Sequence, residues 1–248
     1  MLDTNLKPRR VWPKFNPHRD RRTRSVIITG ASRGLGAALF NVFDACGDRL
    51  LALGRRFNAD QRRAAGDADR IVLRYTDLSE PDTLPSAEDF ERFLASGTGE
   101  AVLVHAAAVV EPIGVLGALD NRELQAAVQV NLLAPMMLSN LFVQAAPAHF
   151  ERLRIVYVTS SAAHRPYPGW ATYCATKAAG ELFMQCAETS ADPRCTVQIV
   201  DPGAMDTDMH RTLRERGTGL PGHERLLGRE LPDPRTVAKR VVGELFVG

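Results

Sequence analysis

One stretch near the start of the chain decides the fold: Ser25–Gly36, which reads SVIITGASRGLG. A β-branched apolar run leads into a glycine-rich turn, and a pattern typical of a helix begins at Ala37. Gly30 ends the predicted strand and lets the chain turn, and the later glycines let backbone N–H groups and the helix N-terminus approach a pyrophosphate. A lone glycine triplet also fits an ordinary tight turn. The position of this one, between a strand and a helix, favours a dinucleotide-binding loop.

Five more apolar runs follow along the chain, and segments with helical periodicity lie between them. This alternation is typical of β-α-β crossovers, which build a mostly parallel sheet with helices on both faces. The sequence therefore predicts an α/β fold, a single doubly wound Rossmann-type domain. The predicted strands are 25–29, 49–53, 70–75, 101–105, 154–159 and 196–200, and the predicted helices are 34–46, 84–96, 121–146, 172–190 and 234–246.

Charge is distributed unevenly along the 248 residues, although the formal net charge is only +2. Residues 1–24 hold eight Lys and Arg side chains against two Asp, so this segment carries +6 and residues 25–248 carry −4. Prolines and the absence of apolar periodicity predict that residues 1–24 are a disordered basic arm outside the folded domain, 25–248. The mildly acidic domain argues against nucleic-acid binding, because such binding needs basic surface to neutralise phosphates.

The four cysteines form no CxxC pair and do not cluster with histidine at metal-ligand spacing, which argues against a zinc site or a disulfide framework. This cysteine usage fits a reducing compartment. No apolar run approaches the about 20 residues that span a bilayer, and no secretory signal precedes the first predicted strand. We therefore expect a soluble, cytoplasmic protein that uses no metal and binds neither membrane nor nucleic acid.

Arginines stand at two places where a dinucleotide would lie. Arg33 is inside the glycine loop, and Arg55 and Arg56 follow the second predicted strand. A fold that prefers NAD usually has an acidic residue after this strand, whereas a guanidinium suits the 2′-phosphate of NADP(H) through charge-assisted hydrogen bonds. The sequence therefore predicts NADP(H) as the cofactor. Solvated surface arginines are the alternative, most strongly for Arg56.

A Tyr-x-x-x-Lys pair, Tyr173 and Lys177, stands near the start of the predicted helix 172–190. Four residues are about one helical turn, so the phenol and the ammonium share a face. A phenol titrates near pH ~10 in isolation, and it needs adjacent positive charge to act as an acid or base near neutrality. Ser160 ends a predicted parallel strand, at the edge of the sheet where ligands bind. An amphipathic helix with an exposed lysine and a packed tyrosine is the alternative.

The glycine loop, the serine, the Tyr-x-x-x-Lys pair and a later Pro202-Gly203 occur in an order that resembles the short-chain dehydrogenase/reductase family, over about residues 25–247. The resemblance implies that a tyrosine donates a proton while a nicotinamide transfers a hydride. It also implies an asparagine that holds a water and relays protons to the lysine. The implied catalytic residues are Asn131, Ser160, Tyr173 and Lys177.

Two of these assignments have alternatives. Ser161 competes with Ser160, and the thirteen-residue separation from the tyrosine, which the family uses, favours Ser160. Ser161 would also point to the other side of an extended chain. For Asn131, the alternative is a polar residue whose hydrogen bonds are satisfied inside a long helix.

The resemblance also implies a cofactor site. Asp77 would contact the adenine edge, and the segment 202–207 would hold the nicotinamide carboxamide, whereas an ordinary turn is the alternative for either one. The implied NADP(H)-binding residues are Gly30, Ser32, Arg33, Gly34, Leu35, Gly36, Arg55, Arg56, Asp77, Leu78, Ala106, Ala107, Tyr173, Lys177, Pro202, Gly203, Met205 and Thr207.

The chain departs from the family pattern at two places. The family usually has Asn-Asn-Ala-Gly after the fourth strand, whereas residues 105–108 read His-Ala-Ala-Ala, whose small side chains still permit a cofactor to approach. The family also has a seventh strand after the helix predicted at 234–246, and this sequence stops at Gly248. We therefore expect six to seven strands, with the sixth near an edge of the sheet. The resemblance implies a homodimer or homotetramer, and the missing strand bears on how it assembles.

Within the family, the segments 109–112, 169–179 and 206–209 look most like sepiapterin reductase and benzil reductase. This resemblance implies an NADPH-dependent carbonyl reductase that converts a ketone or an α-dicarbonyl to an alcohol. A non-catalytic NADP(H) sensor is the alternative function. The Gly- and Pro-rich segment 204–233 is predicted to be an irregular substrate lid. The implied substrate residues are Ser160, His164, Tyr167, Trp170, Tyr173 and Met205, with plain core packing as the alternative for Trp170 and Met205.

Overall fold

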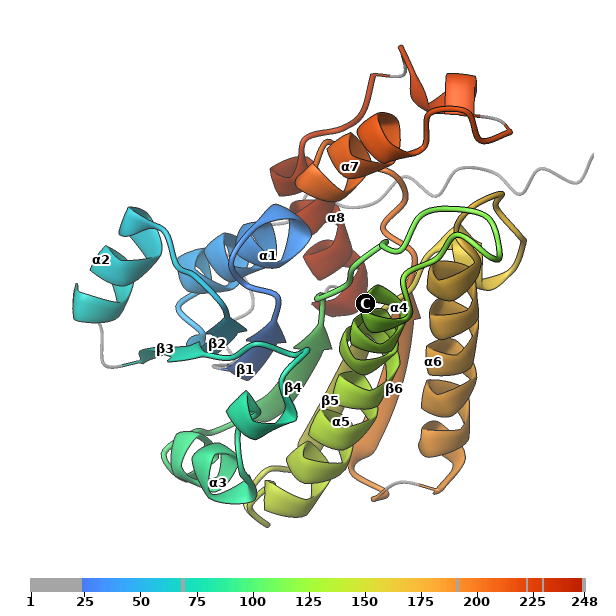
Figure 1. Cartoon of the computed structure of the whole chain (residues 1–248). Helices are drawn as coiled ribbons and strands as arrows, with labels where there is room; N and C mark the ends of the chain where they lie inside the picture. The colour runs from blue at the N-terminus through green and yellow to red at the C-terminus, as the bar shows by residue number, and fades with distance from the viewer. Residues whose placement is uncertain (1–23, 68–69, 191, 222, 229, 247–248) are drawn as a thin grey trace, which may run out of the picture.

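Six apolar strands form one parallel sheet in the order β3-β2-β1-β4-β5-β6, which confirms the predicted fold class (Figure 1). This computed structural model describes residues 24–67, 70–190, 192–221, 223–228 and 230–246. Within them, β6 is the last strand at its edge of the sheet. The strands are β1 (Arg24–Thr29), β2 (Arg49–Gly54), β3 (Ile71–Tyr75), β4 (Glu100–His105), β5 (Arg152–Val158) and β6 (Cys195–Val200).

The central strands β1 and β4 are buried along their whole length because helices cover both faces. In β1, Val26 and Ile28 pack into a core on one face, and Ile27 packs into a second core on the opposite face. This alternation follows from the two-residue period of a strand. All three side chains are fully buried.

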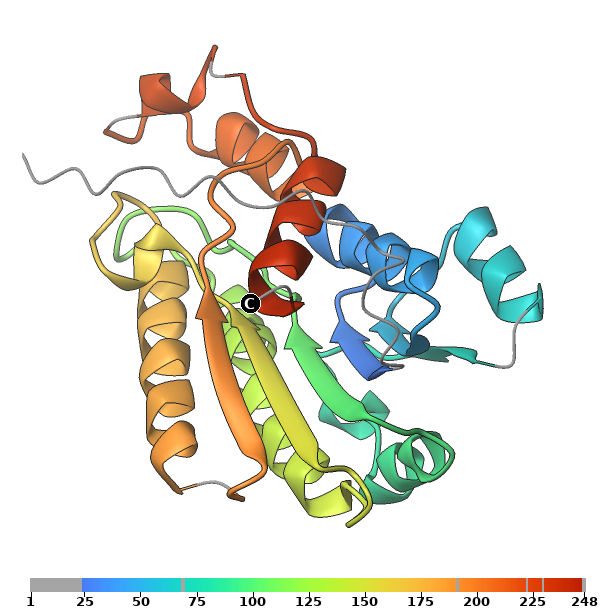
Figure 2. The same cartoon turned by 180° about the vertical axis from the view of Figure 1, so that it is seen from behind.

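Two layers of helices supply the cores (Figures 1 and 2). One layer, which holds α1 and α8, contributes Phe43 and Val242 to the first core. The other layer, which holds α3, α5 and α6, contributes Phe90, Phe142 and Met184 to the second core. The helices are α1 (Gly34–Ala45), α2 (Ala59–Asp67), α3 (Ala87–Ala95), α4 (Asn121–Val128), α5 (Ala134–Ala145), α6 (Ala171–Ser190), α7 (Asp208–Arg216) and α8 (Pro234–Phe246). The 3₁₀ turns are η1 (Pro81–Thr83), η3 (Ser161–Ala163) and η4 (His223–Leu226).

Two helices were not predicted. In α2, Gln61 is the buried residue, so the segment carries no apolar periodicity. The segment 204–233, predicted to be irregular, contains α7 and η4. Only His210 and Leu213 of α7 are buried, and Met209 is its one other apolar residue, so its sequence has no apolar stripe of the usual kind.

The predicted helix 121–146 is one continuous helical segment, because the π-helical turn η2 (Gln129–Leu133) joins α4 to α5. By length and composition, Asn121–Ala145 is apolar enough to cross a membrane, contrary to our reading of the sequence. Its apolar face packs on the sheet, where Leu138 and Phe142 are fully buried. Burial in the core therefore accounts for this composition.

The N-terminal boundary of the domain also needs correction. Residues 1–23 of the predicted basic arm lie outside the described residues, but Arg24, which we placed in the arm, is the first residue of β1. Its Nε and Nη2 atoms donate to the two carboxylate oxygens of Asp48 at 3.1 and 3.0 Å. Both side chains are buried, and the guanidinium also lies 4.4 Å from the ring centroid of Phe246 at the end of α8.

We expect Arg24→Leu to lower the free energy of unfolding by about 3–5 kcal/mol, because the substitution leaves the Asp48 carboxylate buried without its ion partner. Denaturant titration would measure the loss. Arg92→Ala is the control, since it breaks an exposed pair with Glu88 on α3 and should change stability by at most about 0.5 kcal/mol. Equal effects of the two substitutions would contradict this account.

Candidate active site

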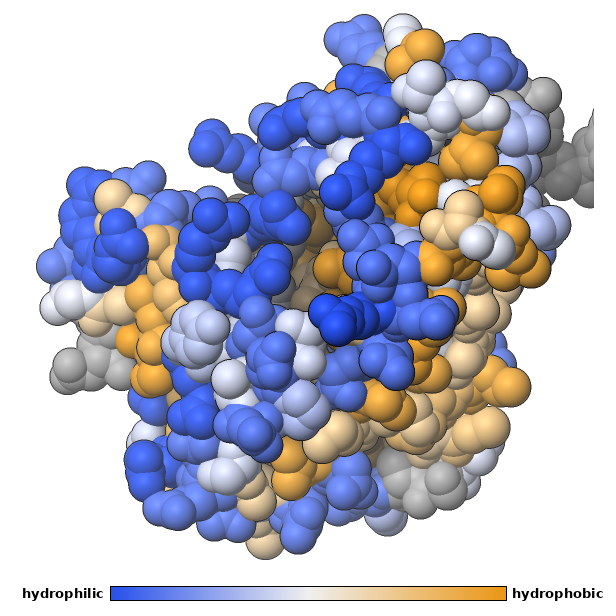
Figure 3. All heavy atoms as spheres, viewed as in Figure 1, coloured by the Kyte–Doolittle hydropathy of each residue, from blue (hydrophilic) through white to orange (hydrophobic). Residues whose placement is uncertain are grey.

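A cleft of about 1200 Å³ lies at the carboxyl edge of the sheet. It is lined by the segments that follow β1, β2, β4, β5 and β6, and α7 covers one side of it. Figure 3 shows a recess on this face, with hydrophobic residues deep inside it and hydrophilic residues around it. The strand order places β1 and β4 side by side at the point where the connections diverge, which is where open α/β sheets bind ligands.

The glycine loop packs so closely on its neighbours that two of its positions leave no room for a side chain. Gly30 has a φ of +71°, and a Cβ there would lie 2.7 Å from the Cα of Ala107. A Cβ at Gly36 would lie 2.2 Å from the carbonyl oxygen of Gly30. No side chain caps the N-terminus of α1, so its first N–H groups are available to an anion. The loop is therefore shaped for a pyrophosphate.

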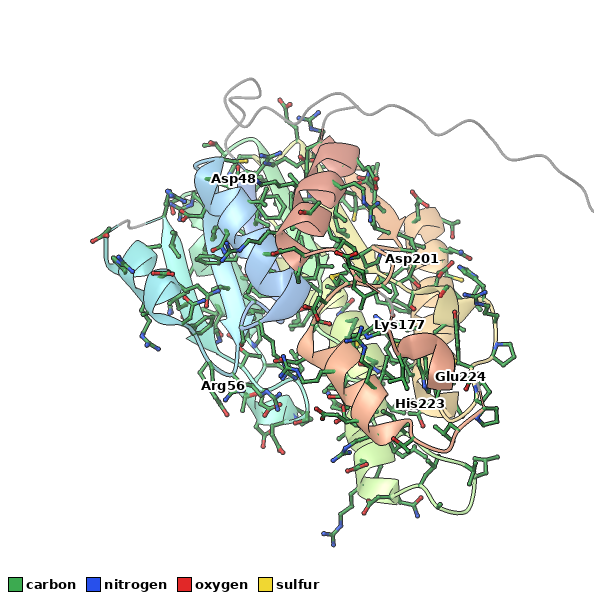
Figure 4. The ribbon with its side chains drawn as sticks, turned by 90° about the horizontal axis from the view of Figure 1, so that it is seen from above. Asp48, Arg56, Lys177, Asp201, His223 and Glu224 are labelled. Carbon is green, nitrogen blue, oxygen red and sulfur yellow. The ribbon has the colours of Figure 1, made fainter. Side chains whose placement is uncertain are left out.

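Three arginines line the cofactor end of the cleft. Arg55 Nη1 lies 3.7 Å from Asp77 Oδ2, and Arg33 Nη1 lies 3.3 Å from Asp208 Oδ2. Both arginines are about half exposed, so an incoming phosphate can reach them. The backbone N–H of Arg56 donates to Ser32 Oγ at 3.3 Å. Figure 4 shows Arg56 well separated from Lys177, as the two ends of an elongated site would be.

Asp77 is fixed in place at the same end of the cleft. Its Oδ1 accepts hydrogen bonds from the backbone N–H and the hydroxyl of Ser79 at 3.1 and 2.7 Å. Partial burial raises the pKa of Asp77, but the hydrogen bonds from Ser79 and the charge of Arg55 outweigh burial and hold the pKa below its usual value. Asp77 is therefore a carboxylate at neutral pH, ready to accept a hydrogen bond.

Tyr173 and Lys177 lie on α6, and burial shifts their pKa values in opposite directions. Lys177 Nζ donates to the carbonyl oxygen of Val158 at 2.7 Å, and the side chain is only 2% exposed. Burial lowers the pKa of Lys177 to about 8, although the charge of Asp201 acts in the opposite direction. Burial raises the pKa of Tyr173 to about 12, and a hydrogen bond with Ser160 offsets part of that rise.

The two candidate serines point to different partners. Ser160 caps η3, where its Oγ accepts from the N–H of Ala162 at 3.2 Å, and it lies close enough to Tyr173 to lower the pKa of the phenol. The Oγ of Ser161 lies 2.9 Å from Tyr167 Oη instead. The arrangement thus brings Ser160 to the phenol and turns Ser161 toward the wall of the cleft.

Asn131 sits in the π-helical turn η2 and is fully occupied by the protein. Its Nδ2 donates to the carbonyl of Val109 at 2.8 Å and to Thr176 Oγ1 at 3.2 Å, and its Oδ1 accepts from the N–H of Val109 at 2.9 Å. The residue is buried and is not among those that line the cleft. In this geometry Asn131 joins the segment after β4 to α6.

Aromatic rings line the cleft beside Tyr173. Tyr167 and Trp170 stack with centroids 4.8 Å apart, and Trp170 meets the Tyr173 ring edge-on at 6.4 Å. Arg165 Nε donates to Tyr167 Oη at 2.7 Å and so helps to fix the wall.

Ion pairs hold α7 over the cleft from both ends. Asp208 at its start pairs with Arg33 of the glycine loop. Arg216 at its end lies 3.7 Å from Glu111 and 3.8 Å from Glu123, which belong to the segment after β4 and to α4. All five side chains are at least partly exposed, so each pair is weak on its own.

The comparisons with known proteins agree with this geometry. Residues 24–217 match the family model for short chain dehydrogenases. The chain belongs to the short-chain dehydrogenase/reductase family. Benzil reductase ((S)-benzoin forming) of Bacillus subtilis (strain 168) is 34% identical over 193 residues, which cover 76% of this chain and 77% of the relative. Sepiapterin reductase of Xenopus tropicalis is 28% identical over 208 residues, which cover 76% of each protein.

A solved short-chain dehydrogenase/reductase from Burkholderia vietnamiensis shares 33% sequence identity with this chain at a TM-score of 0.67. The match covers 87% of this chain and 98% of that protein. These relatives confirm the family and the branch that the sequence resembles. They establish the protein as a family oxidoreductase acting between an alcohol and a carbonyl group.

Most of the implied site residues of this short-chain dehydrogenase/reductase line one cleft, but Gly36 and Asn131 do not, and neither does His164. Its side chain is 65% exposed, and its Nε2 lies 3.4 Å from Glu181 Oε1, outside the residues that line the cleft. Met205 lines the cleft and also packs into the core beside α1. Met205 is therefore part of the cleft lining, as its assignment to the substrate site requires, and also part of the core, which was the alternative.

Several contributors escaped the sequence analysis. Asp201 follows β6 and acts on Lys177, and the Val158 carbonyl anchors the ammonium. The one sequence feature that could have pointed to Asp201 is its position directly before the Pro202-Gly203 pair. A main-chain carbonyl leaves no signal in a sequence. His105, which replaces the family's first asparagine, is buried and hydrogen-bonds Ser139 at 2.9 Å.

The lowered pKa of Lys177 has a measurable consequence for stability. Unfolding restores the ordinary pKa of 10.5, so the unfolded chain binds one more proton than the folded protein between about pH 8 and 10.5. The free energy of unfolding should therefore rise across this window by up to about 3 kcal/mol relative to Lys177→Met. Denaturation at a series of pH values would measure it. Lys239→Met, at an exposed position on α8, should keep the full rise, and a rise in Lys177→Met would contradict the assignment.

Proposed function

We propose that this protein is an NADPH-dependent carbonyl reductase that converts a ketone or an α-dicarbonyl to an alcohol. The observation that carries the proposal is the buried Lys177 ammonium, which lies 5.9 Å from the ring centroid of Tyr173, with Ser160 beside the phenol at the edge of the cleft. The benzil and sepiapterin reductases among its relatives support the choice of carbonyl substrate.

The proton chemistry follows from the side chains. When bound, NADPH supplies the hydride that reduces the carbonyl carbon. Ser160 and Tyr173 hold the carbonyl oxygen by hydrogen bonds, and Tyr173 donates its proton to that oxygen as negative charge develops there. A phenol with a pKa of about 12 carries its proton throughout the neutral range, which suits a donor. The Lys177 ammonium favours the phenolate that remains.

We infer that the cofactor is NADPH and not NADH. Arg33 and Arg55 both line the cleft and are about half exposed, and among the described residues each is paired with a single carboxylate. A 2′-phosphate can accept paired, charge-assisted hydrogen bonds from these guanidinium groups. The glycine loop offers the pyrophosphate its uncapped helix N-terminus.

We also infer that the segment 204–233 is the substrate lid. Its helix α7 contributes Asp208, Met209 and Leu213 to the lining of the cleft. The stacked Tyr167–Trp170 pair packs into the same apolar cluster as Leu213 and Met209 and also lines the cleft, which suits a flat carbonyl compound. Assembly as a homodimer or homotetramer and a cytoplasmic location remain part of the proposal, as the family implies.

The first test removes the proton donor. Tyr173→Phe should lower kcat for carbonyl reduction by about a thousandfold or more, because no other group at the site can protonate the oxygen as directly. Affinity for NADPH, measured by fluorescence titration, should stay within about threefold. Tyr75→Phe, at an exposed position on β3, is the control and should keep full activity. Normal turnover by Tyr173→Phe would overturn the assignment.

A panel of diketones and aromatic ketones with NADPH separates the reductase from the alternative function. Loss of NADPH absorbance with any of these compounds supports the reductase. Tight NADPH binding with no turnover across the panel would favour a nucleotide sensor on the same fold.

The second test concerns the cofactor phosphate. Arg55→Ser should lower kcat/KM for NADPH by about tenfold to a hundredfold, because one charge-assisted contact to the 2′-phosphate is lost, and it should leave kcat/KM for NADH nearly unchanged. Arg63→Ser, an exposed arginine on α2 paired with Asp60, is the matched control. A parallel decline with both cofactors would refute the role of Arg55.

A further inference from the structure

Lys177 keeps a charged group in an almost fully buried position, and that charge has to be stabilised by its neighbours. One hydrogen bond goes to the Val158 carbonyl at 2.7 Å. The charge of Asp201, an exposed residue on the segment after β6, also favours the ammonium. Among the described residues, Asp201 makes no ion pair with the ammonium within 4 Å. One neutral carbonyl and a carboxylate at longer range compensate only in part for the cost of burying a cation.

The ammonium of Lys177 also lies near two aromatic rings, and the nearer one is the ring of Tyr157. Lys177 Nζ lies over this ring, 5.0 Å from its centroid, which is closer than the 5.9 Å to the ring of Tyr173. Tyr157 lies on β5, is 1% exposed and pairs in register with His105 of β4. A cation at this distance from the face of a desolvated ring is attracted by the ring quadrupole.

The hydroxyl of Tyr157 is not what places the ring there. Among the described residues, its Oη has no hydrogen-bond partner although it is buried. The oxygen occupies space left by Gly180 on α6, where a Cβ would lie 2.2 Å from it. The helix that carries the lysine thus also makes room for the tyrosine, so α6 fixes both groups relative to each other.

We propose that Tyr157 is a positioning residue that holds the Lys177 ammonium through the face of its ring and keeps it charged. The proposal rests on the proposed function, in which a charged Lys177 favours the phenolate of Tyr173. Nothing in the role requires the hydroxyl of Tyr157.

The other titratable groups around the ammonium do not replace the ring. Burial, with a further contribution from Lys177, lowers the pKa of His105 to about 3, so His105 is neutral at working pH. Burial raises the pKa of Tyr157 itself above its ordinary value, so its phenol is neutral too. Glu181 on α6 accepts a hydrogen bond from Thr159 at 2.8 Å and lies 3.4 Å from His164, and its charge adds to the rise in the pKa of Tyr157. The ring therefore acts as a neutral but polarised surface.

Two substitutions separate the ring from its hydroxyl. Tyr157→Phe keeps the ring face and removes only the unpaired oxygen. Tyr157→Met keeps an apolar side chain of similar reach and removes the ring. Phe142→Met, in the same core on α5, is the control for the loss of any buried ring. A ring-fluorinated phenylalanine at position 157 keeps the shape and weakens the quadrupole, and it serves if the methionine variant does not fold.

The measurement is the pKa of Lys177 in the full-length protein, read from the ¹³C shift of its labelled Cε and assigned by the signal missing from Lys177→Met. We expect the pKa to fall by about one unit in Tyr157→Met and in the fluorinated variant. It should stay within about 0.3 units of wild type in Tyr157→Phe and Phe142→Met. No shift in the methionine and fluorinated variants, or an equal shift in Tyr157→Phe, would overturn the proposal.

The alkaline limb of carbonyl reduction gives the kinetic counterpart. Its midpoint should move to lower pH by the same amount in Tyr157→Met and should not move in Tyr157→Phe. Because the titration needs no turnover, it still decides the role of Tyr157 if no carbonyl compound proves to be a substrate. A titration that shifts while the kinetic limb stays in place would count against the functional role of the charge.

Discussion

The close contact between the ends of β1 and β4 is the constraint on which the rest of the molecule depends. A side chain at Gly30 would run into the backbone of Ala107, and Thr29 joins the two strands by donating to the Val104 carbonyl and accepting from the N–H of Ala107. These contacts fix the direction in which α1 leaves β1, and with it the empty loop at the helix N-terminus. They also lead the chain after β4 past Val109, where the amide of Asn131 holds it against α6. The cofactor loop and the helix of the reactive tyrosine are thereby parts of one framework.

Burial is the second theme of the site, because it sets the protonation of two neighbouring groups in opposite directions. Burial raises the pKa of Tyr173, which keeps its phenol protonated. The same burial lowers the pKa of Lys177, which makes its ammonium easier to deprotonate. The charge of Lys177 therefore depends on what faces it: a carbonyl, a ring face and a distant carboxylate. A buried cation held by neutral groups titrates close to neutrality, where a small change in its surroundings changes the fraction that is charged. In the mechanism that we propose, the groups around the lysine thus act on the reaction without touching the substrate.

The helix over the cleft is held differently from the core beneath it. Exposed ion pairs attach α7 to the glycine loop at one end and to α4 at the other, whereas the buried pair of Arg24 and Asp48 joins β1 to the turn before β2. Exposed pairs exchange partners at little cost in free energy, and buried pairs do not. Arg33 takes part in two arrangements: it contacts α7 through Asp208, and it lines the cofactor end of the cleft. A group bound at that end would contact a residue that is already paired with Asp208 of α7.

The sequence by itself determined the parallel sheet, the glycine loop and the pairing of tyrosine with lysine on one helix, because these depend on local periodicity and on spacings of one strand or one turn. It did not reveal α2 or α7, whose helices bury too few apolar side chains to leave a periodic pattern. It suggested His164 for the cleft, but only the folded chain shows that this side chain turns to Glu181. Only the tertiary structure decided how deeply Lys177 is buried and which ring its ammonium faces, because Tyr157 and Lys177 come from separate elements. Contacts of that kind depend on how a strand and a helix pack, and neither element carries that information alone.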